Sequence, residues 1–146
     1  MKQKFIDLGL PSGNLWVTEN EVAENGQPLY ATFDEAVKQY GENLPTRDDW
    51  QELIDNVPHL WDKKRDGLLF VARNGKELFL PAMGYYSQFL EDCDMMDYGF
   101  YWSGNTYEHN SEFAYCTEFG KSFVEVSYNS CENGRTIRLI KKGGKQ

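Results

Sequence analysis

Side chains suited to binding another molecule are concentrated between residues 85 and 133. A tyrosine ring offers a large contact area at little cost in conformational entropy, and an asparagine amide both donates and accepts hydrogen bonds. The same residue types also fill gaps in a core or form turns, so every one of them has a structural alternative. The candidate ligand-binding residues are Tyr85, Tyr86, Tyr98, Asn105, Tyr107, His109, Asn110, Tyr128, Asn129, Glu132 and Asn133.

Residues that can hold a transition metal are few. His109 and Glu112 lie three residues apart and could form a site with Asp94 or Cys116, but two scattered histidines are weak support for one. The three cysteines are an odd number without a Cys-x-x-Cys pair, which favours reduced thiols over a zinc site or a disulfide framework. We therefore expect no metal and no cofactor.

Calcium binding and catalysis also lack a sequence pattern. Asp92, Asp94 and Asp97 are close together but do not follow the spacing of a calcium loop, so a solvated acidic loop is the simpler interpretation. The order of serine, histidine and aspartate needed for a catalytic triad is not recognisable. Paired carboxylates could act as acid and base, but an acid-rich segment contains close pairs by chance. The sequence predicts no catalytic residue.

The formal net charge of −8 is carried by one segment. Residues 82–134 contain nine acidic residues and one base, Lys121, whereas the rest of the chain has 14 of each. The same segment holds 13 of the 22 aromatic residues. An acidic surface repels phosphate backbones, so nucleic acid is not an expected partner. We expect a partner protein or glycan that has basic or amphipathic patches.

Length and composition favour one folded domain over residues 1–146. A hydrophobic fraction of 40%, with 15% aromatic residues, argues against disorder, and no apolar run is long enough to insert in a membrane. No apolar stretch precedes Asp7, so no signal peptide is recognised. The compartment in which the protein works stays undetermined.

The first half of the chain predicts two short strands, two helices and a hairpin. The strands flank a Leu-Pro-Ser-Gly turn within residues 5–17. Capping boxes start the helices at Thr32 and Thr46, and apolar residues then recur at i, i+3, i+4 and i+7. Asn74-Gly75 predicts the turn of the hairpin, with both residues able to adopt positive φ.

The second half predicts a loop followed by strands. Residues 82–97 have loop composition, and Asn105, Tyr107, His109 and Asn110 share a stretch with strong turn composition. Strands are expected at 99–103, about 112–119, 122–128 and 134–140, the last of them pairing near the first strand of the chain. In the third of these, Val124 and Val126 are expected to face the core. The order of elements indicates an α+β fold.

Five motifs resemble, in the same order, motifs of the FISUMP-type (major paralogous) domains of gut bacteria. They are Ile-Asp-Leu-Gly-Leu-Pro-Ser-Gly-Asn-Leu-Trp at 6–16, Leu-Pro-Thr-Arg-Asp-Asp-Trp-Gln-Glu-Leu at 44–53, Phe-Leu-Pro-Ala-Met-Gly-Tyr at 79–85, Gly-Phe-Tyr-Trp-Ser at 99–103 and Gly-Arg-Thr-Ile-Arg-Leu-Ile at 134–140. Together they cover nearly the whole chain, which makes the resemblance more specific than any one motif.

This resemblance implies a C-type lectin-like fold, with two helices packed on a twisted antiparallel sheet and long C-terminal loops. The fold is shared with formylglycine-generating enzymes and with the variable proteins of diversity-generating retroelements. In the latter, varied residues of the C-terminal third form a ligand-binding face on phage or cell surfaces, and residues 101–133 are the positional match. The resemblance also implies that Trp16, Trp50, Phe79 and Trp102 belong to the core.

Other functions of the lectin-like fold are less well matched. Sugar-binding C-type lectins use Glu-Pro-Asn and Trp-Asn-Asp motifs for calcium, and neither occurs here, since Trp102-Ser103-Gly104 stands in place of the second. Formylglycine-generating enzymes need a reactive cysteine pair, and Cys116 and Cys131 match no such motif.

The sequence thus predicts a non-enzymatic ligand-binding or display domain. Residues 1–84 and 134–140 form its scaffold, and residues 85–133 its variable, ligand-binding part. Two alternatives stay open. One is a structural virion or fibre decoration domain that uses the same face to form a homo-oligomer, and the other is a degenerate formylglycine-generating-like enzyme.

Overall fold

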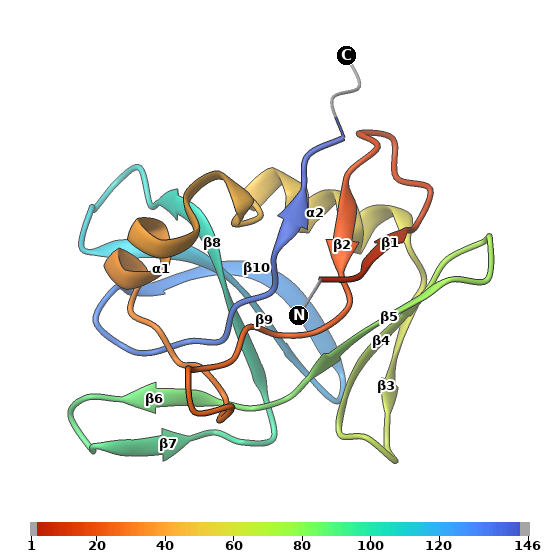
Figure 1. Ribbon diagram of the computed structural model, residues 1–146. Coiled ribbons are helices and arrows are strands. Elements are labelled where there is room, and N and C mark those ends of the chain that lie inside the picture. Colours follow the sequence, from red (N-terminus) through yellow and green to blue (C-terminus); the bar gives the residue numbers. More distant parts are fainter. Residues whose placement is uncertain (1–2, 144–146) are drawn as a thin grey trace.

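The computed structural model describes residues 3–143 and has a mixed α+β fold that consists mostly of strands (Figure 1). Residues 1–2 and 144–146, the ends of the predicted domain, lie outside this description. The described strands form four small antiparallel sheets in the orders β1-β2-β11, β3-β4-β5, β6-β7 and β10-β9-β8. The coarse α+β prediction is therefore confirmed, but the strands do not form one continuous sheet.

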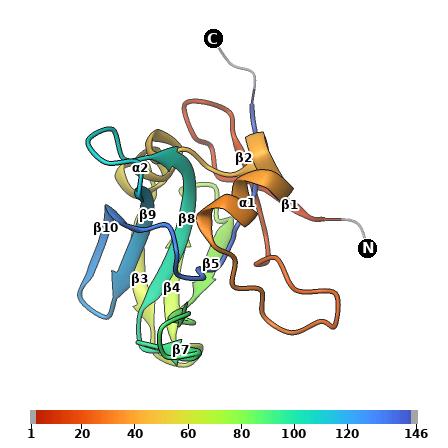
Figure 2. The ribbon, with the colours of Figure 1, turned by 90° about the vertical axis from the view of Figure 1, so that its left-hand side faces the viewer.

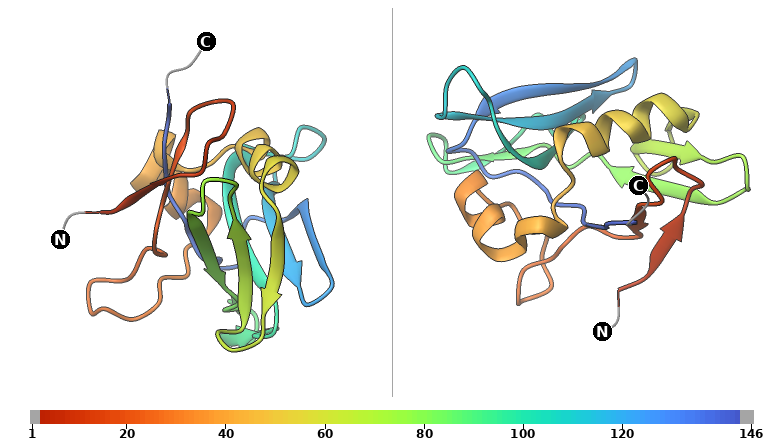
Figure 3. Two further views of the ribbon diagram at one scale, coloured as in Figure 1. Left: turned by 90° about the vertical axis from the view of Figure 1, so that its right-hand side faces the viewer. Right: turned by 90° about the horizontal axis from the view of Figure 1, so that it is seen from above.

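Both helices begin where their capping boxes predict. Helix α1 (Phe33–Tyr40) is capped by Thr32 with Glu35, and a turn of 3-10 helix (Gly41–Asn43) follows it. Helix α2 (Arg47–Asn56) is capped by Thr46 with Asp49. The two helices lie toward the end of the molecule opposite β6 and β7 (Figure 3).

The predicted apolar stripes of the helices are only partly buried, since Tyr40 and Ile54 are half-buried. Trp50 and Leu53 of α2 are fully buried. In α1, Phe33 and Ala36 are buried, but Val37 is 39% exposed. This two-turn helix therefore contacts its neighbours through a narrower stripe than the spacing of its apolar residues allows.

The two ends of the chain meet in one sheet. Strands β1 (Phe5–Asp7) and β2 (Leu15–Val17) pair across the predicted turn, and β11 (Ile140–Lys141) pairs with β2. The predicted strand at 134–140 is therefore mostly wrong. Gly134 bridges to Tyr86, Arg135 to Ala31 and Thr136 to Tyr101. These partners belong to different parts of the fold, so the extended segment never forms one ladder.

The central hairpin is confirmed and gains a third strand. Strands β4 (Gly67–Val71) and β5 (Glu77–Pro81) pair as predicted, and β3 (His59–Asp62), which the sequence did not indicate, pairs with β4. In the turn only Gly75 has positive φ, at 86°. Asn74 instead donates to the Asp7 carbonyl at 2.9 Å and accepts from the Lys76 backbone at 2.9 Å.

The segment predicted as a loop at 82–97 contains a small hairpin. Strands β6 (Tyr85–Ser87) and β7 (Asp92–Asp94) pair antiparallel, and the prediction missed them because three-residue strands have no periodic pattern. Gly84 sits tightly against this hairpin with φ at 61°, and a Cβ atom there would lie 2.1 Å from the Asp94 carbonyl oxygen. Only glycine fits this position.

Three long strands form the sheet on or beside which most of the candidate binding residues lie. These are β8 (Gly99–Thr106), β9 (Phe113–Gly120) and β10 (Phe123–Ser130), with β9 in the middle (Figure 2). Strand β8 is longer than predicted, so Asn105 lies at its end and not in a loop. The long C-terminal loops implied by the resemblance are replaced largely by strands.

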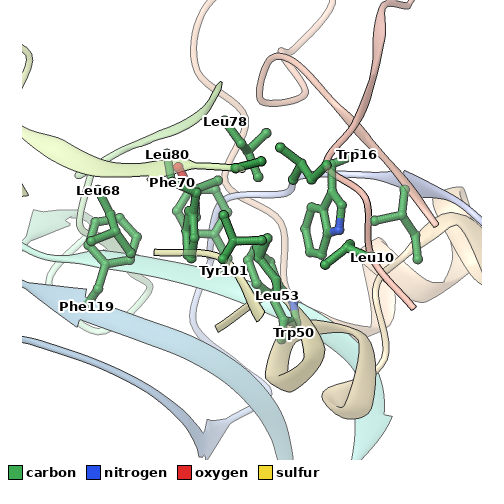
Figure 4. Packing of buried hydrophobic residues seen from close by; sticks show 14 residues of the cluster. Leu10, Trp16, Trp50, Leu53, Leu68, Phe70, Leu78, Leu80, Tyr101 and Phe119 are labelled. Atoms are coloured by element: carbon green, nitrogen blue, oxygen red, sulfur yellow. The ribbon is translucent and has the colours of Figure 1, made fainter. Parts of the chain in front are cut away.

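Two hydrophobic clusters lie on opposite sides of this sheet. The larger one contains Tyr101 and Phe119 together with residues of α2, β2, β4 and β5, and Trp16 and Trp50 meet in it at 4.7 Å between ring centroids (Figure 4). Val124 and Val126 pack against this cluster, as predicted.

The smaller cluster contains Trp102, Ala114 and Cys116 together with residues of α1 and the C-terminal segment. Trp16, Trp50 and Trp102 are fully buried, which agrees with the core role expected for them. The core role expected for Phe79 is not found, because Phe79 alternates with buried Leu78 and Leu80 on β5 and is only half-buried. Its ring is covered by Arg65, whose guanidinium carbon lies 4.3 Å from the ring centroid.

Candidate functional site

The structure divides most of the candidate residues between two places on the β8–β9–β10 sheet. Successive residues of a strand face opposite sides of a sheet. Tyr128 is paired with Tyr115 in the register, and Asn129 is paired with Ala114. Tyr128 and Asn129 therefore belong to different faces, and no single face presents all the candidates.

The first place is an aromatic group that we call the tyrosine cluster, formed by Tyr107, His109, Phe113, Tyr115 and Tyr128. Tyr107 and Tyr128 stack with ring centroids 3.9 Å apart and planes inclined by 10°. Tyr107 also meets the edges of His109 at 5.2 Å and Tyr115 at 5.6 Å. Tyr128 remains 44% exposed, so the stack offers aromatic surface to solvent.

Helix α2 braces this cluster through its first residue. Arg47 Nη1 donates to the Tyr115 hydroxyl at 3.1 Å, and the guanidinium carbon lies 4.9 Å from the Tyr115 ring centroid. Tyr115 in turn donates to the Glu108 carboxylate. Asn105 accepts from the backbone N–H of Arg47 at 2.7 Å, which ties the end of β8 to the start of α2.

These contacts set the charge states of the cluster. The hydrogen bond from Tyr115 holds the pKa of Glu108 below its ordinary value, and the same bond raises the pKa of Tyr115. Desolvation, followed by its contact with Tyr128, raises the pKa of Tyr107. Tyr107 and Tyr115 therefore stay neutral and Glu108 stays ionised across the physiological range.

The second place is a cavity of about 480 Å³ that we call the aromatic pocket. It lies on the face opposite the tyrosine cluster and contains four of the predicted residues, Tyr85, Tyr98, Asn129 and Asn133. Its other lining residues are Met95, Phe100, Glu118, Phe123 and Arg135.

Contacts between neighbouring side chains order the pocket wall. The Tyr85 ring meets Phe100 edge to face at 5.3 Å, and Tyr98 lies 6.0 Å from Phe123. Glu118 accepts a hydrogen bond from the Asn129 amide at 3.4 Å. The pocket therefore combines aromatic walls with a carboxylate and amides.

The remaining candidates join neither place. Tyr86 exchanges backbone hydrogen bonds with Gly134, at 2.7 and 2.8 Å, which gives it a structural role. Glu132 is exposed in the turn after β10. Asn110 is exposed beside the cluster, where its side chain accepts from the Glu112 backbone as a turn residue does.

Several residues of the two places were not predicted. Tyr115 was missed because both alternating faces of 112–119 are rich in apolar residues, and β9 is indeed buried on both sides. Nothing in the sequence near Arg47 indicates that a helix start reaches the sheet. Arg135 falls within an extended segment that also contains Arg138, and the sequence pattern does not show which of the two arginines lines a pocket.

Metal ligands and reactive thiols do not converge in the part of the chain that the structure describes. Between residues 3 and 143 no group of three His, Cys, Asp or Glu side chains is placed to hold an ion. The three cysteines carry free thiols. Cys116 is fully buried, and burial raises the pKa of its thiol, which keeps it protonated.

A larger hollow of about 970 Å³ lies elsewhere, lined by residues 3–4 and 17–22. It contains none of the predicted binding residues. No helix among the described residues is long and apolar enough to cross a membrane.

Comparison of the chain with protein-family models, with curated proteins and with solved structures finds no match. The functional argument therefore rests on the geometry of the two places.

Proposed function

We propose that the protein is a non-enzymatic binding or display domain that recognises a protein or glycan surface through the tyrosine cluster. The stacked pair of Tyr107 and Tyr128 carries this proposal, because it combines exposed aromatic area with a fixed geometry. Large aromatic contacts that are ordered before binding lose little entropy when a partner docks.

The brace behind the stack supports the same conclusion. Arg47, Tyr115 and Glu108 connect the cluster to α2, so the rings are held by a helix and by two strands. Glu108 and the exposed His109 and Asn110 surround the rings with polar groups. An aromatic centre with a polar rim is the usual arrangement of a protein interface.

We also propose that the fold is a C-type lectin-like domain of the FISUMP type. The order of the elements supports this, with two capped helices between an opening strand pair and a set of antiparallel strands. The pairing of β11 with β2 supports it as well, since it joins both ends of the chain in one sheet.

A variable face on a phage particle or cell surface is part of this proposal. Tyr107, His109, Tyr115 and Tyr128 all fall within residues 101–133, and Tyr115 and Tyr128 are held on strands. A neighbouring reverse-transcriptase gene with an adenine-mutated repeat of these codons would establish diversification. The absence of such a repeat would remove this part of the proposal.

The binding function is tested by alanine substitution of the stacked rings. Wild-type protein, Tyr107→Ala and Tyr128→Ala are screened against a glycan array and a displayed-peptide library. Phe5→Ala is the matched control, because Phe5 is 42% exposed but lies far along the chain in β1. We expect the selected binders to lose at least about tenfold in affinity with each tyrosine variant and to keep it with Phe5→Ala. Binders that ignore both tyrosine variants would contradict the proposal.

One observation favours the structural alternative, in which copies of the chain assemble through this face. Strand β10 is an outer strand of its sheet, and its exposed Tyr128 lies beside that unpaired strand edge. The enzymatic alternative has less support, since the protonated, buried thiol of Cys116 is a poor nucleophile.

A further inference from the structure

Arg135 is a buried arginine whose hydrogen-bonding groups are not satisfied. Its side chain is 1% exposed, and the atoms Nε and Nη1 have no hydrogen-bond partner. Arg138, three residues later and equally buried, donates from Nε to Asn20 at 2.9 Å and from Nη1 to the Val17 carbonyl at 3.2 Å. Arg138 therefore holds the fold together, whereas Arg135 keeps donors unused.

Aromatic rings take the place of a counter-ion around Arg135. Its guanidinium carbon lies 5.2 Å from the ring centroid of Tyr85, 5.0 Å from that of Phe100 and 5.1 Å from that of Trp102. No carboxylate within residues 3–143 forms an ion pair with it. Ring faces attract a cation, but they do not accept its N–H groups as a carboxylate does.

Arg135 lines the aromatic pocket, which has room for a small molecule. The cavity of about 480 Å³ is walled by Tyr85, Phe100 and Phe123, and amides of Asn129 and Asn133 contribute polar groups. A buried cation in the wall of an aromatic cavity is complemented by an anionic group on a flat, apolar body.

We propose that the aromatic pocket binds a small monocarboxylate with an aromatic body, whose carboxylate pairs with Arg135. The positive charge of the guanidinium, which forms part of the cavity wall, attracts the carboxylate, and the aromatic walls cover the rest of the ligand. The inference goes beyond the proposed function, since this pocket opens on the other face of the sheet and uses none of the tyrosine cluster.

The acids beside the pocket explain why one negative charge fits better than two. Glu118 lines the cavity, and Glu125 is its direct partner across the β9–β10 pair. Like charges opposite each other repel, and both repel an incoming anion. A doubly charged phosphate meets this repulsion twice and gains nothing from the aromatic walls.

The proposal is tested by adding benzoate to the full chain and measuring its binding by NMR and by calorimetry. We expect saturable shifts of pocket residues such as Tyr98 and Asn133, with a dissociation constant on the order of 1 mM. Benzamide, which has the same body without the charge, is expected to bind about tenfold more weakly. Inorganic phosphate, which has the charge without the body, is expected to bind more weakly than benzoate.

A charge variant tests the electrostatic argument without touching the buried arginine. Glu118→Gln keeps a side-chain oxygen for Asn129 and removes the repulsion, so it should tighten benzoate binding about threefold. Glu112→Gln, an exposed acid of the same segment that does not line the pocket, is the matched control. A purely structural role of Glu118 would not tighten binding.

Three results would overturn the proposal. They are no saturable response up to about 50 mM benzoate, equal binding of benzoate and either benzamide or phosphate, and equal effects of Glu118→Gln and Glu112→Gln. Arg135→Met is expected to abolish benzoate binding if the variant folds. Because Tyr107→Ala should leave benzoate binding unchanged, failure here is distinguishable from failure of the proposed surface recognition.

Discussion

The hydroxyl group of Tyr115 joins helix α2 to the tyrosine cluster, since it accepts from Arg47 and donates to Glu108. Tyr115→Phe removes the hydrogen bond to Glu108 together with the one from Arg47, and it leaves the aromatic ring in place. We expect the pKa of Glu108, which the bond holds below its ordinary value, to rise toward the usual glutamate range near 4.3. An NMR titration of the Glu108 carboxyl carbon measures this change.

Tyr128→Phe is the control for this titration, because Tyr128 stacks on the cluster but does not bond Glu108. If Tyr115→Phe and Tyr128→Phe leave the same Glu108 titration curve, the brace does not exist in solution. Wild-type stability from this contact is present above the unfolded pKa of Glu108 and is lost as the pH falls through its lower folded pKa.

Residue types alone pointed to three members of the tyrosine cluster. Tyr107, His109 and Tyr128 are binding-type residues in a polar context, and they do come together. Arg47 and Arg135 were not predictable, because their roles arise from where distant segments meet. The sequence shows an arginine at each position but not whether a carboxylate, a carbonyl or a ring lies beside it.

At the scale of elements, the first turn of α2 is a junction between distant parts of the chain. Asp49 caps the helix, accepts from the Asn14 amide at 2.9 Å and pairs with Lys142 at 2.6 Å. Burial raises the pKa of Asp49, but the bonds from Lys142 and Thr46 outweigh this, and the pKa lies below its ordinary value. The ionised carboxylate therefore stabilises the fold.

We predict that Asp49→Asn lowers the free energy of unfolding by about 1 kcal/mol at pH 7. The stabilisation is present above the unfolded pKa, near 3.9, and is lost as the pH falls through the lower folded pKa. The difference between wild type and variant should therefore shrink from pH 4 toward pH 2 in urea titrations.

Asp48→Asn makes the same charge change at the neighbouring position, where the side chain is 87% exposed. It should have little effect on stability at any pH. Equal destabilisation by Asp48→Asn and Asp49→Asn would show that the charge at the helix start sets the stability, and that the contacts of Asp49 with Asn14 and Lys142 do not contribute to it.

Elements with local signals were predictable, and elements defined by distant partners were not. The caps at Thr32 and Thr46 depend on residues three positions away, so the sequence located both helices. Strands β3, β6 and β7 have three or four residues each and exist because a neighbouring strand offers hydrogen bonds. The segment at 134–140 looks like a strand but changes partner from residue to residue.

At the scale of the molecule, the placement of charge bears on whether copies of the chain associate. A symmetric contact through the tyrosine cluster would bring Glu108 and its acidic surroundings against the same groups of the second copy. We therefore expect light scattering at about 0.15 M salt to give the monomer mass of 17.0 kDa. A stable dimer or trimer that Tyr128→Ala dissociates would support the structural alternative instead.

The same uneven charge predicts how binding responds to salt. Residues 82–134 carry the entire net charge, so the field at the binding face comes from nearby acids and weakens when salt screens it. We expect the association rate with a basic peptide selected in the display screen to fall about tenfold between 50 and 500 mM salt. Surface plasmon resonance measures this rate directly.

Two double variants that remove equal charge locate the source of the salt effect. Glu112→Gln with Glu132→Gln neutralises exposed acids of the acidic segment, and Glu24→Gln with Glu42→Gln does so in the balanced remainder. The first pair should reduce both the association rate and its salt dependence, and the second should change neither. Equal effects of the two pairs would mean that the protein attracts its partner by total charge, and the segment from 82 to 134 would then have no special part in recognition.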